Sequence, residues 1–103
     1  MFKSIYSIQD VKVCVFHAPM VLLNDAEARR VFCDITNDPQ TPIFKHPKDF
    51  RLFKIGGFDD NSGVISPLGQ PEFLTDAYPL HGKRLDQVTE DVLVDVPVVP
   101  RSV

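Results

Sequence analysis

The chain has 103 residues, of which 44% are hydrophobic, and its formal net charge is −3. This length suits one domain but not two, and no segment comes near the roughly 20 consecutive apolar residues that span a membrane. The chain begins without the basic and apolar segments of a secretion signal and has only two cysteines, so we expect a cytoplasmic protein with no membrane contact.

The first 16 residues predict a β-hairpin. Phe2–Ile8 is rich in aromatic and β-branched residues, and Gln9-Asp10 suits a tight turn. Residues 11–16 then alternate valine with other residues in the period of two that a strand imposes. Pro19 is expected to end the pairing or to mark an edge.

A helix is predicted directly after this hairpin. Asn24 supplies a capping oxygen, and Glu27, three residues later, completes a capping-box pattern. An apolar stripe with helical spacing follows, which consists of Ala28, Val31, Phe32 and Ile35. The helix must end at Asn37-Asp38-Pro39, because proline cannot continue it.

Two further strands complete the predicted domain. Residues 50–55 are a strand candidate, Gly56-Gly57 suggests a bulge, and Asp59–Gly63 suits a hairpin turn that leads into a return strand at Val64-Ile65. We therefore expect an α+β fold of ββαββ type, in which one helix packs on one face of an antiparallel sheet. A domain this small buries little surface, which favours a homo-oligomer.

Residues 1–69 are assigned to this domain, and residues 70–103 to an acidic, proline-rich tail that is extended or partly disordered. The domain is neutral, since eight basic residues balance eight acidic ones, whereas the tail has three basic and six acidic residues. The net negative charge therefore does not exclude nucleic acid as a partner of the domain.

A basic and aromatic segment at residues 44–54 is the main candidate site. Cations in a row suit backbone phosphates, and exposed aromatic rings suit unstacked bases. The alternative is that the rings belong to the core and the cations are merely solvated. The candidate nucleic-acid-binding residues in this segment are Lys45, Lys48, Arg51, Phe53 and Lys54. Arg29 and Arg30, on the predicted helix, form a second patch, for which ion pairs with nearby carboxylates are the alternative.

Signs of catalysis are weak. Asp59 and Asp60 are adjacent, but they occupy positions where a turn favours aspartate. The sequence has no phosphate-binding glycine loop with a lysine and no nucleophile elbow, and its three histidines lack the spacing of a zinc site. We expect no enzyme activity, no cofactor and no metal.

Four segments, Ile5–Asp10, Thr36–Pro39, Lys45–Gly56 and Phe58–Gly63, occur in an order and at spacings that suggest a known family. They resemble the small nonstructural DNA-binding protein of gokushoviruses, which are single-stranded DNA bacteriophages of the Microviridae. The resemblance covers about residues 1–68.

The resemblance implies a protein of the host bacterial cytoplasm that binds single-stranded DNA. Its implied role is to assist genome replication and the switch to single-strand synthesis and packaging. The alternative function is a protein-binding regulator of the replication initiator or the procapsid that has no direct affinity for DNA.

Overall fold

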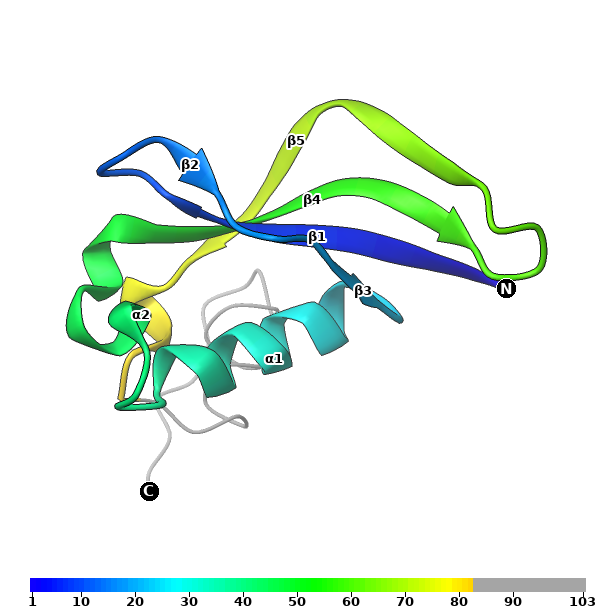
Figure 1. The fold of residues 1–103 in the computed structure, drawn as a ribbon. Helices are drawn as coiled ribbons and strands as arrows, with labels where there is room; N and C mark the ends of the chain where they lie inside the picture. The colour runs from blue at the N-terminus through cyan, green and yellow to red at the C-terminus, as the bar shows by residue number, and fades with distance from the viewer. Residues whose placement is uncertain (83–103) are drawn as a thin grey trace, which may run out of the picture.

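A computed structural model describes residues 1–82 of the chain. Five strands and two α-helices make up most of it, together with two short 3-10 helices (Figure 1). The strands are β1 (Phe2–Asp10), β2 (Val15–Phe16), β3 (Met20–Leu22), β4 (Phe50–Asp59) and β5 (Ile65–Asp76). The helices are α1 (Asp25–Thr36), α2 (Pro42–Lys45), η1 (Pro47–Asp49) and η2 (Tyr78–Leu80).

The strands form one antiparallel sheet in the order β2-β1-β4-β5, and β3 also pairs with β1. Helix α1 lies below one face of this sheet, and the opposite face, here called the outer face, carries no helix among residues 1–82 (Figure 1). The predicted α+β class, the antiparallel sheet and the single main helix are confirmed, and the ββαββ arrangement holds broadly.

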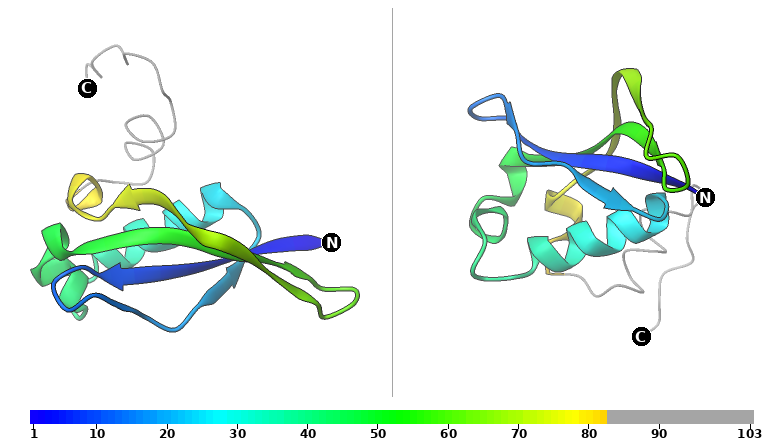
Figure 2. Two further views of the ribbon diagram at one scale, coloured as in Figure 1. Left: turned by 90° about the horizontal axis from the view of Figure 1, so that it is seen from above. Right: turned by 45° about the vertical axis from the view of Figure 1, so that its right-hand side comes forward.

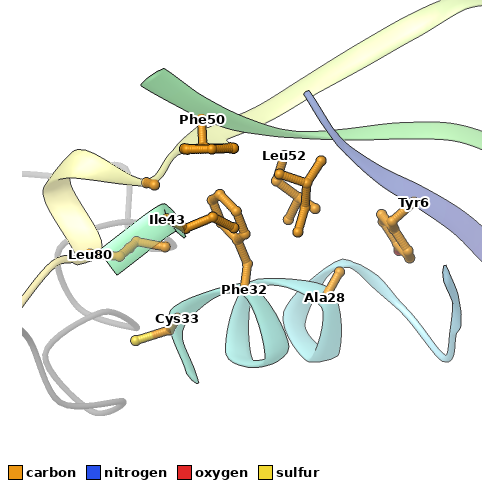
Figure 3. Close-up of a cluster of buried hydrophobic side chains, with 10 residues drawn as sticks. Tyr6, Ala28, Phe32, Cys33, Ile43, Phe50, Leu52 and Leu80 are labelled. Atoms are coloured by element: carbon orange, nitrogen blue, oxygen red, sulfur yellow. The ribbon is translucent and has the colours of Figure 1, made fainter. Parts of the chain in front are cut away.

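The hydrophobic core lies between α1 and the sheet (Figure 3). Phe32 of α1 points up toward the strands, where Ile8 of β1 and Leu52 of β4 stand opposite each other in the register. The buried residues of this cluster are Tyr6, Ile8, Ala28, Phe32, Cys33, Ile43, Phe50, Leu52, Ala77 and Leu80. Burial of such side chains stabilises the fold by about 1.5–3 kcal/mol each for the large ones.

Helix α1 has the predicted bounds because its signals are local. The Oδ1 atom of Asn24 accepts a hydrogen bond of 2.9 Å from the backbone N–H of Glu27, and the Glu27 carboxylate accepts one of 2.7 Å from the N–H of Leu23. The helix ends at Thr36, and Asn37 then closes it with hydrogen bonds to the last turn. Pro39 follows directly, as predicted.

The N-terminal hairpin differs from the prediction. Gln9 and Asp10 are not in a turn, because they continue β1 and pair with Arg51 and Phe50 of β4. The turn is at residues 11–14, and β2 is only two residues long. Cys14 lies exposed in that turn with a positive φ of 59°, whereas Cys33 of α1 is buried, as free cysteines usually are.

The sheet also extends beyond the boundary predicted at residue 69. Strand β5 continues to Asp76, and Leu80 beyond it is buried in the core. The side-chain amide of Asn37 donates a hydrogen bond of 3.1 Å to the backbone oxygen of Leu80, which ties this segment to the end of α1. The rest of the predicted tail, residues 83–103, lies outside the described residues.

Proline did not prevent β5 from forming because this strand is at the edge of the sheet. Pro67 and Pro71 offer no N–H donor, and edge strands tolerate such residues. The pairing with β4 is irregular between these two prolines, where the register shifts between Lys54 and Gly56. The bulge expected near Gly56-Gly57 is therefore present.

The β4–β5 hairpin extends past the end of α1 as a long arm (Figure 2). Its strands come very close at Gly56, where an added Cβ would lie 2.9 Å from the backbone oxygen of Ser66. The turn predicted at Asp59–Gly63 closes this arm, and Gly63 has a positive φ of 76°. Glycine is favoured there because it adopts positive φ without steric cost.

Candidate nucleic-acid interface

Three phenylalanine rings form a row across the outer face, here called the aromatic row: Phe16 of β2, Phe53 of β4 and Phe73 of β5. The ring centroids of Phe16 and Phe53 are 5.4 Å apart, and those of Phe53 and Phe73 are 5.8 Å apart, both with an edge-to-face geometry. Side chains alternate between the two faces of a strand. Leu52 points into the core, and its neighbour Phe53 therefore points away from α1.

The aromatic row is accessible to a ligand. Phe73 is 49% exposed and Phe16 is 40% exposed, whereas Phe53 between them is half-buried. Aromatic rings of this size usually bury much of their surface, so an exposed row on a sheet face marks a candidate binding surface. The two end rings are the ones with the most free surface.

Arg51 borders the aromatic row on the same face of β4. Its Cζ atom lies 5.7 Å from the centroid of the Phe73 ring, and its Nε atom is 2.9 Å from a carboxylate oxygen of Asp76. The ion pair is exposed, so it contributes only about 0–1 kcal/mol to stability. A phosphate can therefore displace Asp76 from Arg51 at little cost.

Lys48 and Tyr78 form a second cation–ring contact beyond Arg51. The Nζ atom of Lys48 in η1 lies 4.9 Å from the centroid of the Tyr78 ring in η2. Both side chains are exposed. The two segments run side by side, since the backbone N–H of Ala77 donates a hydrogen bond of 3.0 Å to the oxygen of Phe50.

Lys54 faces the other way, toward α1. Its Nζ atom is 3.0 Å from Asp25 at the start of α1, and the hydroxyl of Tyr6 donates a hydrogen bond of 2.6 Å to the same carboxylate. Burial by itself would raise the pKa of Asp25, but the hydrogen bonds from Tyr6 and Lys54 outweigh it and lower the pKa below its ordinary value of 3.8. Burial and the hydrogen bond to Asp25 raise the pKa of Tyr6. Lys54 thus forms an ion pair within the fold and does not belong to the outer face.

The remaining candidates also lie away from the outer face or apart from its rings. Arg29 and Arg30 belong to α1, which covers the opposite face of the sheet. Arg30 is exposed, and the Nε atom of Arg29 is buried without a hydrogen-bond partner among residues 1–82. Lys45 is exposed at the end of α2, and no ion pair joins it to another described residue.

The structure therefore brings two of the seven predicted residues together on the outer face, Arg51 and Phe53, and it places Lys48 nearby in η1, in contact with Tyr78. It separates them from Lys54, Arg29 and Arg30. The sequence prediction missed the other two rings of the aromatic row, Phe16 and Phe73, and the ring of Tyr78 beside Lys48. In the sequence, only the alternating pattern of residues 11–16 indicated that Phe16 lies on a strand. No local pattern marked Phe73 or Tyr78 as an exposed ring.

Comparison with known proteins gives one match. The family model described as Phage ORF5 protein matches residues 3–80, which include all the strands and helices described above except the first residue of β1. No curated protein and no solved structure matches the chain. Among the described residues, no helix is long and apolar enough to cross a membrane. Since the family model covers most of the chain, the protein belongs to the Phage ORF5 protein family and is a bacteriophage protein.

Proposed function

We propose that this phage protein binds single-stranded DNA on its outer face. In this proposal it is not an enzyme and uses no cofactor. It acts in the cytoplasm of the host bacterium, where it assists genome replication and the switch to single-strand synthesis and packaging. A gokushovirus origin is part of the proposal and rests on the sequence resemblance.

The observation that carries the proposal is the exposed aromatic row with Arg51 beside it. Stacking of an unpaired base on a protein ring contributes about 1–3 kcal/mol per base and tolerates any base sequence. Phe16 and Phe73 present exposed rings for this purpose, and the guanidinium of Arg51 is within reach of a neighbouring phosphate. In a duplex the bases are stacked inside, so we expect a preference for single strands.

Charge limits the affinity of a single copy. Arg51 lies beside the aromatic row and Lys48 lies in η1, three residues before it. Each phosphate contact contributes a slope of about −0.7 to the dependence of log K on log salt concentration. Binding should therefore be weak and moderately salt-sensitive. A homo-oligomer would place several such surfaces along one strand and raise the overall affinity.

Fluorescence anisotropy of a labelled oligothymidylate, at low and at moderate salt, tests the proposal. We expect salt-sensitive binding that Phe73→Leu weakens about five-fold or more, since this corresponds to the loss of about 1 kcal/mol of stacking. Phe2→Leu is the matched control, because Phe2 is 71% exposed but lies outside the aromatic row.

Two results would contradict the proposal. One is the absence of binding by the wild-type protein at low salt, and this would favour the alternative, a regulator that binds the replication initiator or the procapsid. The other is an equal loss of affinity in Phe73→Leu and Phe2→Leu, because it would show that the aromatic row has no special role.

A further inference from the structure

We infer that Tyr78 and Lys48 form a second nucleotide-binding position, next to the aromatic row and separate from it. This inference rests on the proposed function and extends it, since it adds a base-stacking ring in η2 that the basic and aromatic segment does not contain. The ligand class is the same: an unpaired base together with its backbone phosphate.

The ring of Tyr78 is held in an exposed position by its neighbours. Tyr78 is 56% exposed, whereas Ala77 before it and Leu80 after it are both fully buried. The turn is closed by a hydrogen bond of 2.9 Å from the N–H of Leu80 to the oxygen of Ala77, and by one of 3.1 Å from the N–H of His81 to the oxygen of Tyr78. The backbone that carries the ring is thus anchored on both sides, which lowers the entropy cost of binding a ligand there.

Arg51 connects this position to the aromatic row. Residues 48–51 and 76–78 lie side by side, and within them Phe50 and Ala77 are buried in the core. Arg51 contacts both Phe73 and Asp76, and Asp76 is only two residues before Tyr78. Arg51 therefore contacts the ring of Phe73 directly and is linked to the segment that carries Tyr78 through Asp76.

Arg51 contacts the ring of Phe73, and Lys48 contacts the ring of Tyr78, so each of the two rings has a cation beside it. Each nucleotide of a single strand likewise joins one base to one phosphate. The Nζ atom of Lys48 lies 4.9 Å from the centroid of the Tyr78 ring, so a base that stacks on the exposed part of this ring lies near a positive charge. This match in pattern supports a second nucleotide position.

A purely structural role is the competing explanation. A cation–ring contact stabilises the two segments that it joins, and on this explanation Lys48 simply holds η1 against η2. In that case a change at Tyr78 would lower stability but would leave DNA binding unaltered. The two explanations therefore predict different measurements.

The experiment compares oligothymidylates of about 4 and about 16 nucleotides, the range of lengths that single-strand-binding domains contact. For Tyr78→Leu we expect a loss of affinity of about five-fold or more with the long oligonucleotide and a smaller loss with the short one, which fits on the aromatic row. Tyr78→Phe keeps the ring and should bind both lengths like the wild type. Lys48→Gln should make the salt dependence with the long oligonucleotide less steep by about 0.7.

The outcomes separate this inference from the proposed function. If the wild type binds DNA but Tyr78→Leu, with an unchanged circular dichroism spectrum, binds both lengths as well as the wild type, the second position does not exist. An equal loss at both lengths also contradicts it, since Tyr78 then acts through the fold. If the wild type binds neither length, the proposed function fails and the second position fails with it.

Discussion

Phe16 and Phe53 touch across an intervening strand: their ring centroids are 5.4 Å apart although β1 lies between β2 and β4. The residue of β1 that stands opposite Phe53 is Ser7, whose side chain is too small to separate the rings. The Ser7 hydroxyl also donates a hydrogen bond of 2.7 Å to the backbone oxygen of His17, next to Phe16. One small buried residue thus permits the row to form.

Substitution of Ser7 by leucine should break up this row. Ser7 is buried, so the larger side chain must push Phe16 away from Phe53, and the hydrogen bond to His17 is lost as well. We expect a decrease of about 1–3 kcal/mol in the free energy of unfolding, measured by urea denaturation. We also expect weaker binding to oligothymidylate. Ser7→Ala is the control: it loses the hydrogen bond but keeps the space, and it should bind DNA much as the wild type does.

Removal of the Asp76 charge should strengthen DNA binding. In the free protein the carboxylate of Asp76 forms an ion pair with Arg51, and a phosphate must replace this carboxylate to bind Arg51. Asp76→Asn is expected to raise the affinity for oligothymidylate about two- to five-fold at low salt, which corresponds to the weak ion pair that no longer has to break.

A matched control distinguishes this competition from a general effect of charge. Glu72→Gln removes the same charge from the same strand, but Glu72 stands opposite Lys54 in the register and not opposite Arg51. Glu72→Gln should change the affinity for oligothymidylate less than Asp76→Asn does. The gain from Asp76→Asn should also disappear in an Arg51→Gln background, and a gain that persists there would rule out competition for Arg51.

Asp25 should make the fold sensitive to acid. Its pKa is lowered in the folded protein by the hydrogen bonds from Tyr6 and Lys54, which outweigh its burial. A carboxyl group with a lowered folded pKa stabilises the fold above its unfolded pKa, and this stabilisation is lost as the pH falls through the folded value. The loss should therefore begin near pH 4 and increase below it.

Urea denaturation of the wild type and of Asp25→Asn at about pH 7 and about pH 3 measures this contribution. The wild type should lose more stability between the two pH values than the variant does. Asp59 and Asp60 also have lowered pKa values, but they are unchanged in both proteins and cancel in the comparison. An equal loss in both proteins would show that Asp25 makes no contribution.

Gly56 should not tolerate a side chain. A Cβ at this position would lie 2.9 Å from the backbone oxygen of Ser66, so β4 and β5 would have to move apart. Gly56→Ala is expected to lower the free energy of unfolding by about 1–3 kcal/mol. Gly57→Ala is the neighbouring control, because the nearest atom to its Cβ would be the Lys3 oxygen at an ordinary distance of 3.8 Å. Thermal unfolding followed by circular dichroism compares the two.

The features that the sequence predicted correctly are those with local causes. Helix α1 follows from the cap at Asn24, its apolar stripe and the proline after it, and all of these signals lie within 16 residues. The hairpin turn before β5 follows from Asp59 and Gly63. The end of β1 was misplaced, since the pairing of Gln9 with Arg51 across 42 positions of the chain overrides the local preference for a turn.

The candidate site was less predictable because strands distant in the sequence create it. Phe53 was recognised within its own segment, but its partners Phe16 and Phe73 reach it only through the strand order β2-β1-β4-β5. Lys54 looked equivalent to Arg51 in the sequence. Strand alternation places it on the opposite face, where it pairs with the carboxylate of Asp25, and this partner on α1 can be identified only from the fold.

The two prolines of β5 have a consequence for crowded conditions. At high concentration, an edge strand with free backbone groups can pair with the edge strands of other copies and start fibrils. Pro67 and Pro71 lack backbone N–H donors along the edge where such pairing would start. The two prolines made β5 difficult to predict from the sequence, and they also protect the protein from amyloid-like stacking at high local concentration.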